Sequence, residues 1–218
     1  MQIIMFSDKY GLTNAVLQGR KTMTRRIIPF DIRNATDWKA FEEGEMKCYG
    51  TGEGDWVDVR RLAKYKVGEV VAVAQSYKSI HEEMMNGDYG DSRYDAFRCA
   101  KVAGTKGWSS KMFVRADLMP HQIRITDIKV ERLQDISEED CLREGIQSFD
   151  TPFGKNFVAG GVYVGQDARL KIAKGMINIA KPFKTPRGAF AVLISRVSGR
   201  GTWESNPYVF AYSFELVK

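Results

Sequence analysis

The sequence predicts a single α+β domain spanning residues 1–218, and three observations support this fold class. The 218 residues are 44% hydrophobic and 28% charged, which is typical of soluble globular proteins of one generous domain. An apolar run at 70–74 and a period-2 alternation at 208–215 predict strands. A capping-box pattern that starts at Ser137, with Gly145 as a stop, predicts a helix.

Weaker patterns predict the remaining elements. Residues 1–6 form an apolar stretch that is far too short for a signal sequence or a membrane span. We therefore expect this stretch to be a first strand. A short helix capped by Ser7 or Asp8 follows and ends at Gly19. The alternation over 122–133 changes phase near Asp127, which predicts two strand segments that meet at a bulge or bend.

Another helix is expected over 189–197, where the apolar spacing is helical and Gly199 follows. Three long segments, near 31–66, 78–117 and 147–186, lack sustained periodicity and are expected to be insertions. The second carries turn signals that predict hairpins and surface loops. In the third, 172–179 predicts a strand or short helix, and Pro182 and Pro186 are expected to break regular structure.

Charge and cysteine usage restrict the function. A net charge of +6 and a pI near 9.2 favour phosphate-bearing partners, although many basic proteins bind no nucleic acid. The cysteines, Cys48, Cys99 and Cys141, are odd in number and lack C-x-x-C spacing, so neither a disulfide framework nor a zinc site is indicated. The same cysteine usage favours a reduced, cytoplasmic location. With two histidines and no ligand cluster, we expect no metal. We also expect no cofactor and no membrane partner.

A basic motif at residues 19–26 reads Gly-Arg-Lys-Thr-Met-Thr-Arg-Arg. Arg20, Arg25 and Arg26, together with Lys21 and two hydroxyls, could clamp a phosphate backbone without any catalysis. A solvated turn that serves solubility is the alternative.

The stretches 16–26, 136–146 and 203–209 together resemble the ASCH family, a branch of the PUA-like superfold, and its larger bacterial and phage-associated members in particular. The G-x-K-T-x-T-x-R core of the basic motif is the most specific part. The resemblance implies a PUA-like mixed β-barrel flanked by short helices, with a cleft that faces RNA or nucleotides. The three insertions would be long loops added to this barrel.

One compact branch of the family is similar to amidohydrolases that remove the acetyl group from N4-acetylcytidine. By that resemblance, Lys21 is the proton acceptor, Thr24 the nucleophile and Glu144 the proton donor. Neighbouring arginines and burial would lower the pKa of Lys21, as such a base requires. In a regular strand Lys21 and Thr24 point to opposite faces, so this site requires the backbone to turn between them.

Other roles for these residues stay open. Glu144 could lie on an ordinary solvated helix surface. Tyr77, Trp203 and Asn206 are candidates for a base-binding pocket, with core or rim packing and a strand-entry turn as the alternatives. We therefore expect a protein that binds RNA or a modified nucleoside, with amidohydrolase activity on an N-acylated nucleobase; a non-catalytic RNA-binding module and a protein-interaction role are the alternatives.

Overall fold

The structure is a computed structural model, and it describes residues 1–28, 37–40, 46–49, 57–86, 102, 104–151, 154–158 and 183–217. Its strands are β1 (Ile3–Ile4), β2 (Met23–Ile27), β3 (Asp37–Ala40), β4 (Met46–Tyr49), β5 (Val57–Asp58), β6 (Val70–Val73), β7 (Gln122–Arg132), β8 (Gln147–Thr151), β9 (Gly154–Val158) and β10 (Tyr208–Val217). Its α-helices are α1 (Leu12–Leu17), α3 (Tyr77–Asn86), α5 (Glu138–Arg143), α7 (Pro186–Ser198) and α8 (Thr202–Ser205). Short 3₁₀ turns are η1 (Asp8–Tyr10), η3 (Val59–Leu62), η4 (Lys106–Trp108), η5 (Lys111–Phe113), η6 (Ala116–Leu118) and η7 (Leu133–Asp135).

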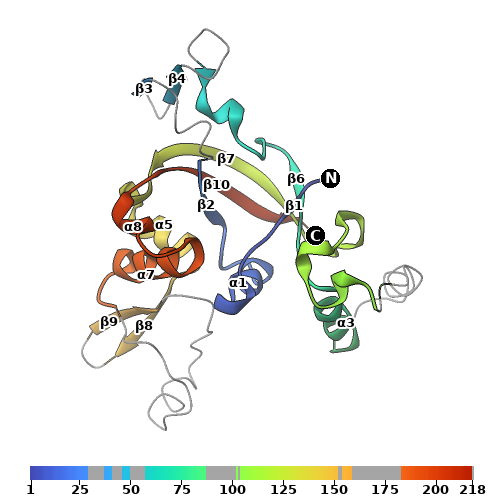
Figure 1. The fold of residues 1–218 in the computed structure, drawn as a ribbon. Coiled ribbons are helices and arrows are strands. Elements are labelled where there is room, and N and C mark those ends of the chain that lie inside the picture. Colours follow the sequence, from blue (N-terminus) through green and yellow to red (C-terminus); the bar gives the residue numbers. More distant parts are fainter. Residues whose placement is uncertain are drawn as a thin grey trace. The chain divides into compact units, whose positions relative to one another are not determined.

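The α+β class is confirmed by a five-stranded mixed sheet with the order β1-β6-β7-β10-β2 (Figure 1). β1 runs parallel to β6, whereas β6 with β7, and β10 with β2, pair antiparallel. β1 and β2 are the edges of this sheet, so the strands that the structure describes do not close into a barrel. Smaller sheets are formed by β3-β4-β5 and β8-β9.

The chain divides into two compact units. Unit 1 comprises 1–6, 70–124 and 216–218, and unit 2 comprises 7–69 and 125–215. β7 therefore contributes its first three residues to unit 1 and the rest to unit 2.

Unit 1 has its own core, in which α3 packs by residues at helical spacing, Tyr77, Ile80 and Met84. The Tyr77 hydroxyl accepts a hydrogen bond from the backbone N–H of Arg115 at 2.9 Å. The hairpins expected over 78–117 are wrong for the described part, which forms α3 and 3₁₀ turns, because these apolar residues recur every three to four positions and not every two.

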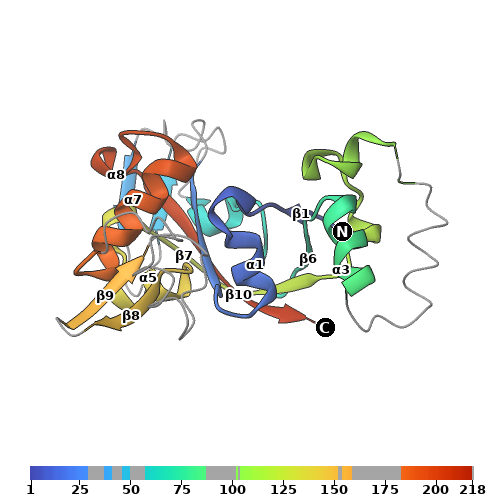
Figure 2. The same cartoon turned by 90° about the horizontal axis from the view of Figure 1, so that it is seen from below.

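Unit 2 contains most of the other predicted elements. α5 has the expected cap, since the Ser137 hydroxyl accepts from the backbone N–H of Asp140 at 3.0 Å, and Gly145 follows with φ +98°. α7 packs against α5, α8 and β9 (Figure 2). It begins at Pro186, which was expected to break structure. At the first turn of a helix the missing N–H of proline has no intrahelical partner to lose, and Thr185 supplies the cap.

Three further expectations are refined. The helix expected between Ser7 and Gly19 is divided into η1 and α1 by Gly11, whose φ is +65°. The change of phase near Asp127 is present, because Ile125 and Ile128 are both buried, yet β7 continues through it as one strand. The segment near 31–66, expected to be irregular, contains β3, β4 and β5, while residues 172–179 and Pro182 lie outside the described residues.

Candidate functional site

The basic motif enters β2, and its pairing with β10 sets the direction of each side chain. Thr24 lies opposite Tyr212 and Arg25 opposite Ala211. The carbonyl of Thr22 accepts from the N–H of Phe214 at 2.9 Å, so the pairing reaches back to the residue after Lys21. Successive side chains of a strand point to opposite faces, which puts Met23 and Arg25 on one face and Thr24 and Arg26 on the other.

Lys21 and Glu144 meet on the Arg25 side of the strand. The Lys21 Nζ donates to Glu144 Oε2 at 2.5 Å and to the Glu144 backbone carbonyl at 2.8 Å. Lys21 is 2% exposed and Glu144 4%. Glu144 is the C-terminal cap of α5, and the carbonyl of Arg143 beside it accepts from the N–H of Thr22 at 2.9 Å, which fixes the end of α5 against the entry of β2.

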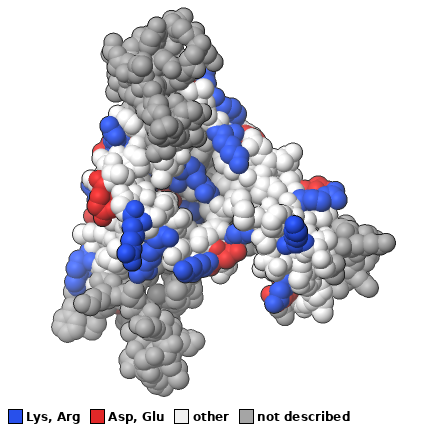
Figure 3. All heavy atoms as spheres, in the orientation of Figure 1, with Lys and Arg blue, Asp and Glu red and all other residues white. Residues whose placement is uncertain are grey.

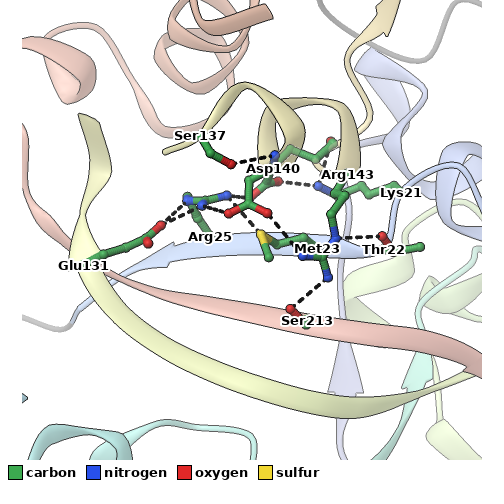
Figure 4. A network of polar contacts seen from close by, with 10 residues as sticks. Lys21, Thr22, Met23, Arg25, Glu131, Ser137, Asp140, Arg143 and Ser213 are labelled. Carbon is green, nitrogen blue, oxygen red and sulfur yellow. Dashed lines mark hydrogen bonds and ion pairs between the residues drawn. The ribbon is translucent and has the colours of Figure 1, made fainter. Parts of the chain in front are cut away.

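Arg25 binds three carboxylates from the same buried position (Figure 4). Its Nη1 donates to Glu144 Oε1 at 3.3 Å, and its Nη2 lies 3.1 Å from Asp140 Oδ2 and 2.6 Å from Glu131 Oε1. Its guanidinium carbon lies 6.0 Å from the ring centroid of Phe190, on α7. Arg25 is therefore directed inward and is surrounded by protein.

Arg143 completes this ionic cluster. Its Nη1 donates to Asp140 Oδ1 at 3.1 Å, its Nη2 to the Ser213 hydroxyl at 3.0 Å, and its Nε to the Thr22 hydroxyl at 3.5 Å. The ionic cluster thus consists of three cations, Lys21, Arg25 and Arg143, and three carboxylates, Glu131, Asp140 and Glu144. When all six groups are ionised their charges cancel, so the cluster offers no excess positive charge to a phosphate.

Burial and neighbouring charges shift the pKa values of Lys21 and Arg25, the two most buried cations of the cluster, in opposite directions. Loss of hydration lowers the pKa of Lys21 below its ordinary value, and the charges of Arg26 and Arg25 act in the same direction, against the attraction of Glu144. For Arg25, burial alone would lower the pKa, but the carboxylates of Glu144 and Glu131 raise it. Arg25 therefore stays positively charged, whereas Lys21 releases its proton more readily than an ordinary lysine.

The structure brings together two of the three residues to which the resemblance assigns catalysis. Thr24 is 5% exposed and lies on the opposite face of β2 from Arg25 and the ionic cluster, next to Tyr212. The backbone makes no turn between Lys21 and Thr24 that would bring them to one face. Of the three arginines expected at phosphates, Arg25 is buried in the ionic cluster, whereas Arg20 and Arg26 are partly exposed.

The candidate pocket residues all make contacts within the protein. Tyr77 belongs to the core of unit 1. In unit 2, Trp203 lies edge-on to Phe190 at 6.2 Å and its carbonyl accepts from Gln134 Nε2. Asn206 has φ +43°, and its Oδ1 accepts from the backbone N–H of Gln134 at 2.8 Å, so it anchors the turn before β10.

Sequence reasoning missed Glu131, Asp140, Arg143 and Ser213. One signal was available for Asp140, since it lies four residues before Glu144 and such residues share a helix face. For Glu131 and Ser213 no local signal exists, because strand pairing alone places them near α5. Since the charges of the ionised cluster cancel, the net charge of +6 belongs to the rest of the chain. On the face drawn in Figure 3, lysine and arginine side chains are more prominent than acidic ones.

The described residues contain no group of three or more His, Cys, Asp or Glu arranged to hold a metal ion. Within the same ranges, every helix is too short or too polar to cross a bilayer. A scan against protein-family models gave no match, and searches of curated proteins and of solved structures gave none either.

Proposed function

We propose that this chain is a cytoplasmic ASCH-type protein with a PUA-like barrel that hydrolyses an N-acylated nucleobase such as N4-acetylcytidine, in RNA or as a nucleoside. The observation that carries the proposal is the contact between Lys21 and Glu144, which lie 123 residues apart and meet at 2.5 Å in a buried site. A buried lysine with a lowered pKa beside a carboxyl group is typical of an acid–base site. The five-stranded mixed sheet supports the α+β part of this proposal; a barrel would require further pairing at β1 and β2, the edges of the sheet in the described residues.

The contact lets one proton move between a base and an acid. Loss of hydration lowers the pKa of Lys21, and the charge of Arg25 acts in the same direction, so the neutral amine is the proton acceptor of the proposed site. The hydrogen bond between Lys21 Nζ and Glu144 Oε2, at 2.5 Å, lets the carboxylate take up that proton and serve as the proton donor.

In the proposed reaction, the oxygen of a water molecule bonds to the acyl carbon, and one proton of that water passes to the neutral Lys21 amine. This proton moves along the hydrogen bond to Glu144, the bond from the acyl carbon to the exocyclic nitrogen breaks, and Glu144 gives the proton to that nitrogen. The products are the free amino base and, from N4-acetylcytidine, acetic acid, which loses its proton to the solvent and leaves as acetate. Lys21 and Glu144 are then in their starting forms.

Water is proposed as the nucleophile, in place of the role that the resemblance implies for Thr24. The reason is geometric, because Thr24 lies on the opposite face of β2 from the ionic cluster. Thr24→Ala is expected to retain most of the activity. If Thr24→Ala abolishes cytidine release while Thr24→Ser retains it, the hydroxyl of Thr24 is the nucleophile.

The experiment is release of cytidine from N4-acetylcytidine and from an acetylated RNA oligonucleotide, measured for wild type, Lys21→Met and Glu144→Gln. Both variants are expected to lose at least about a hundredfold in rate, the usual contribution of a positioned acid or base. Lys129→Met, which removes an exposed lysine from β7, is the matched control and should keep the wild-type rate.

A second candidate is a non-catalytic RNA-binding module. It is favoured by the burial of Lys21, Thr24 and Glu144, each at most 5% exposed, and by the partial exposure of Arg20 and Arg26. In this case Arg20→Gln and Arg26→Gln weaken RNA binding, whereas Arg196→Gln, at an exposed position of α7, does not. RNA binding with no cytidine release from any acylated pyrimidine would favour this second function.

A further inference from the structure

The two oxygens of Glu144 are held by different cations. Oε2 accepts from Lys21 Nζ at 2.5 Å, and Oε1 accepts from Arg25 Nη1 at 3.3 Å. Arg25 is itself fixed on the other side, because Asp140 and Glu131 bind its Nη2 and Glu131 also binds its Nε. A single side chain thereby connects Glu144 with α5 and β7.

We propose that Arg25 is a positioning residue that holds one oxygen of Glu144 away from Lys21, so that Lys21 contacts a single carboxylate oxygen and the backbone carbonyl. This inference rests on the proposed function, and it gives Arg25 a role in the reaction without contact to the substrate. It also replaces the phosphate-binding role expected for Arg25, whose side chain is 1% exposed and bound to three carboxylates.

The chemistry of the guanidinium group explains why an arginine suits this position. Its planar fork presents donors in several fixed directions, so it binds Glu144, Asp140 and Glu131 together. A lysine would place one ammonium group near only part of this set. Phe190 from α7 and Met23 Sδ, at 3.2 Å from Nη1, occupy the remaining surroundings of the group.

Among the described residues, charged groups that act on Lys21 include Glu144, at the C-terminal cap of α5, and Arg26 and Arg25, on β2. Arg25 lowers the affinity of Lys21 for its proton in two ways. Its charge repels the Lys21 ammonium group, and it also binds the Glu144 carboxylate that attracts this ammonium group. Removing Arg25 leaves all of Glu144 to Lys21, so the amine holds its proton more tightly. The base is then available only at higher pH.

The test compares Arg25→Lys with the charge-balanced double variant Arg25→Met/Glu131→Gln, which removes one cation and one carboxylate. NMR titration of the Lys21 side chain, assigned by its absence in Lys21→Met, reads the site without requiring activity. The pH profile of cytidine release provides the second readout. Arg196→Gln, which removes an exposed arginine from the same unit, is the control.

Both Arg25 variants are expected to move the Lys21 titration to higher pH. Their hydrolysis rate should fall below that of wild type at pH 7, because a smaller fraction of the Lys21 amine is neutral, and recover at higher pH. If Lys21 titrates at the same pH in either Arg25 variant as in wild type, the positioning role is overturned, whether or not the variant is less stable than wild type. If wild type releases no cytidine, the proposed reaction fails, but the NMR titration still tests the position of Arg25.

Discussion

A lysine ammonium loses most of its hydration when it is buried, and Lys21 is only 2% exposed. Such a charge persists only where opposite charge and hydrogen bonds replace water, as Glu144 does here with its carboxylate and its carbonyl. Buried ion pairs contribute little net stability compared with apolar residues of the same shape. The buried pair is therefore weak evidence for a stabilising role.

The first prediction at this scale concerns the pair itself. Lys21→Met should lower the free energy of unfolding by about 3 kcal/mol, because Glu144 is left buried with only Arg25 to compensate it. The double variant Lys21→Met/Glu144→Leu should be less destabilised than Lys21→Met alone. Urea unfolding measures both, with Lys129→Met as the control. A double variant that is less stable than either single variant would show that the pair is a stabilising contact.

The second prediction concerns pH. The pKa of Lys21 is lowered in the folded protein from an ordinary value of 10.5, so between the two pKa values the unfolded chain binds more protons. The contribution of Lys21 to the free energy of unfolding therefore rises with pH from the folded-state pKa up to 10.5. The difference between wild type and Lys21→Met, followed by urea unfolding at successive pH values, should show this slope. A difference that stays flat contradicts a lowered pKa.

At the scale of elements, the end of α5 and the entry of β2 form one structural unit around the ionic cluster. Gly145 allows the chain to leave α5 with φ +98°, and a Cβ there would lie 3.6 Å from the Lys21 Cβ. Gly19 has φ +68° and open space around it. Both positions favour glycine, but only Gly145 touches the site.

Gly145→Ala is accordingly expected to destabilise the protein by about 1–2 kcal/mol through its backbone conformation, as is Gly19→Ala. Only Gly145→Ala should also alter the Lys21 side chain, because the new methyl group packs against it. Thermal unfolding measures the first effect and NMR of the Lys21 side chain the second. Equal spectra for the two variants would contradict the arrangement at the end of α5.

Most helices and long strands could be predicted from the sequence, because their signals are local. Ser137 and Gly145 delimit α5, and the alternation after Tyr208 defines β10. The division of the chain into two units could not be predicted, since it depends on contacts between distant segments. At the site, the resemblance indicated Lys21 and Glu144, but only strand pairing shows that Arg25 points inward and that Thr24 faces away.

At the scale of the whole molecule, the net charge of +6 is carried outside the balanced ionic cluster. Affinity for single-stranded RNA should therefore fall with rising salt, and each phosphate-binding arginine that is removed should reduce the slope of log affinity against log salt by about 0.7. Arg20→Gln and Arg26→Gln are expected to do so, whereas Arg196→Gln is not. RNA affinity that is independent of salt would exclude a phosphate-binding surface.

The measurement that tests the central claim most directly is the release of cytidine and acetate from N4-acetylcytidine by the full chain. We predict that wild type and Lys129→Met release both products at the same rate, and that Lys21→Met and Glu144→Gln, once shown to be folded, release them at least about a hundredfold more slowly. The account is contradicted if the wild type leaves the substrate intact, or if Lys21→Met and Glu144→Gln release cytidine at the wild-type rate.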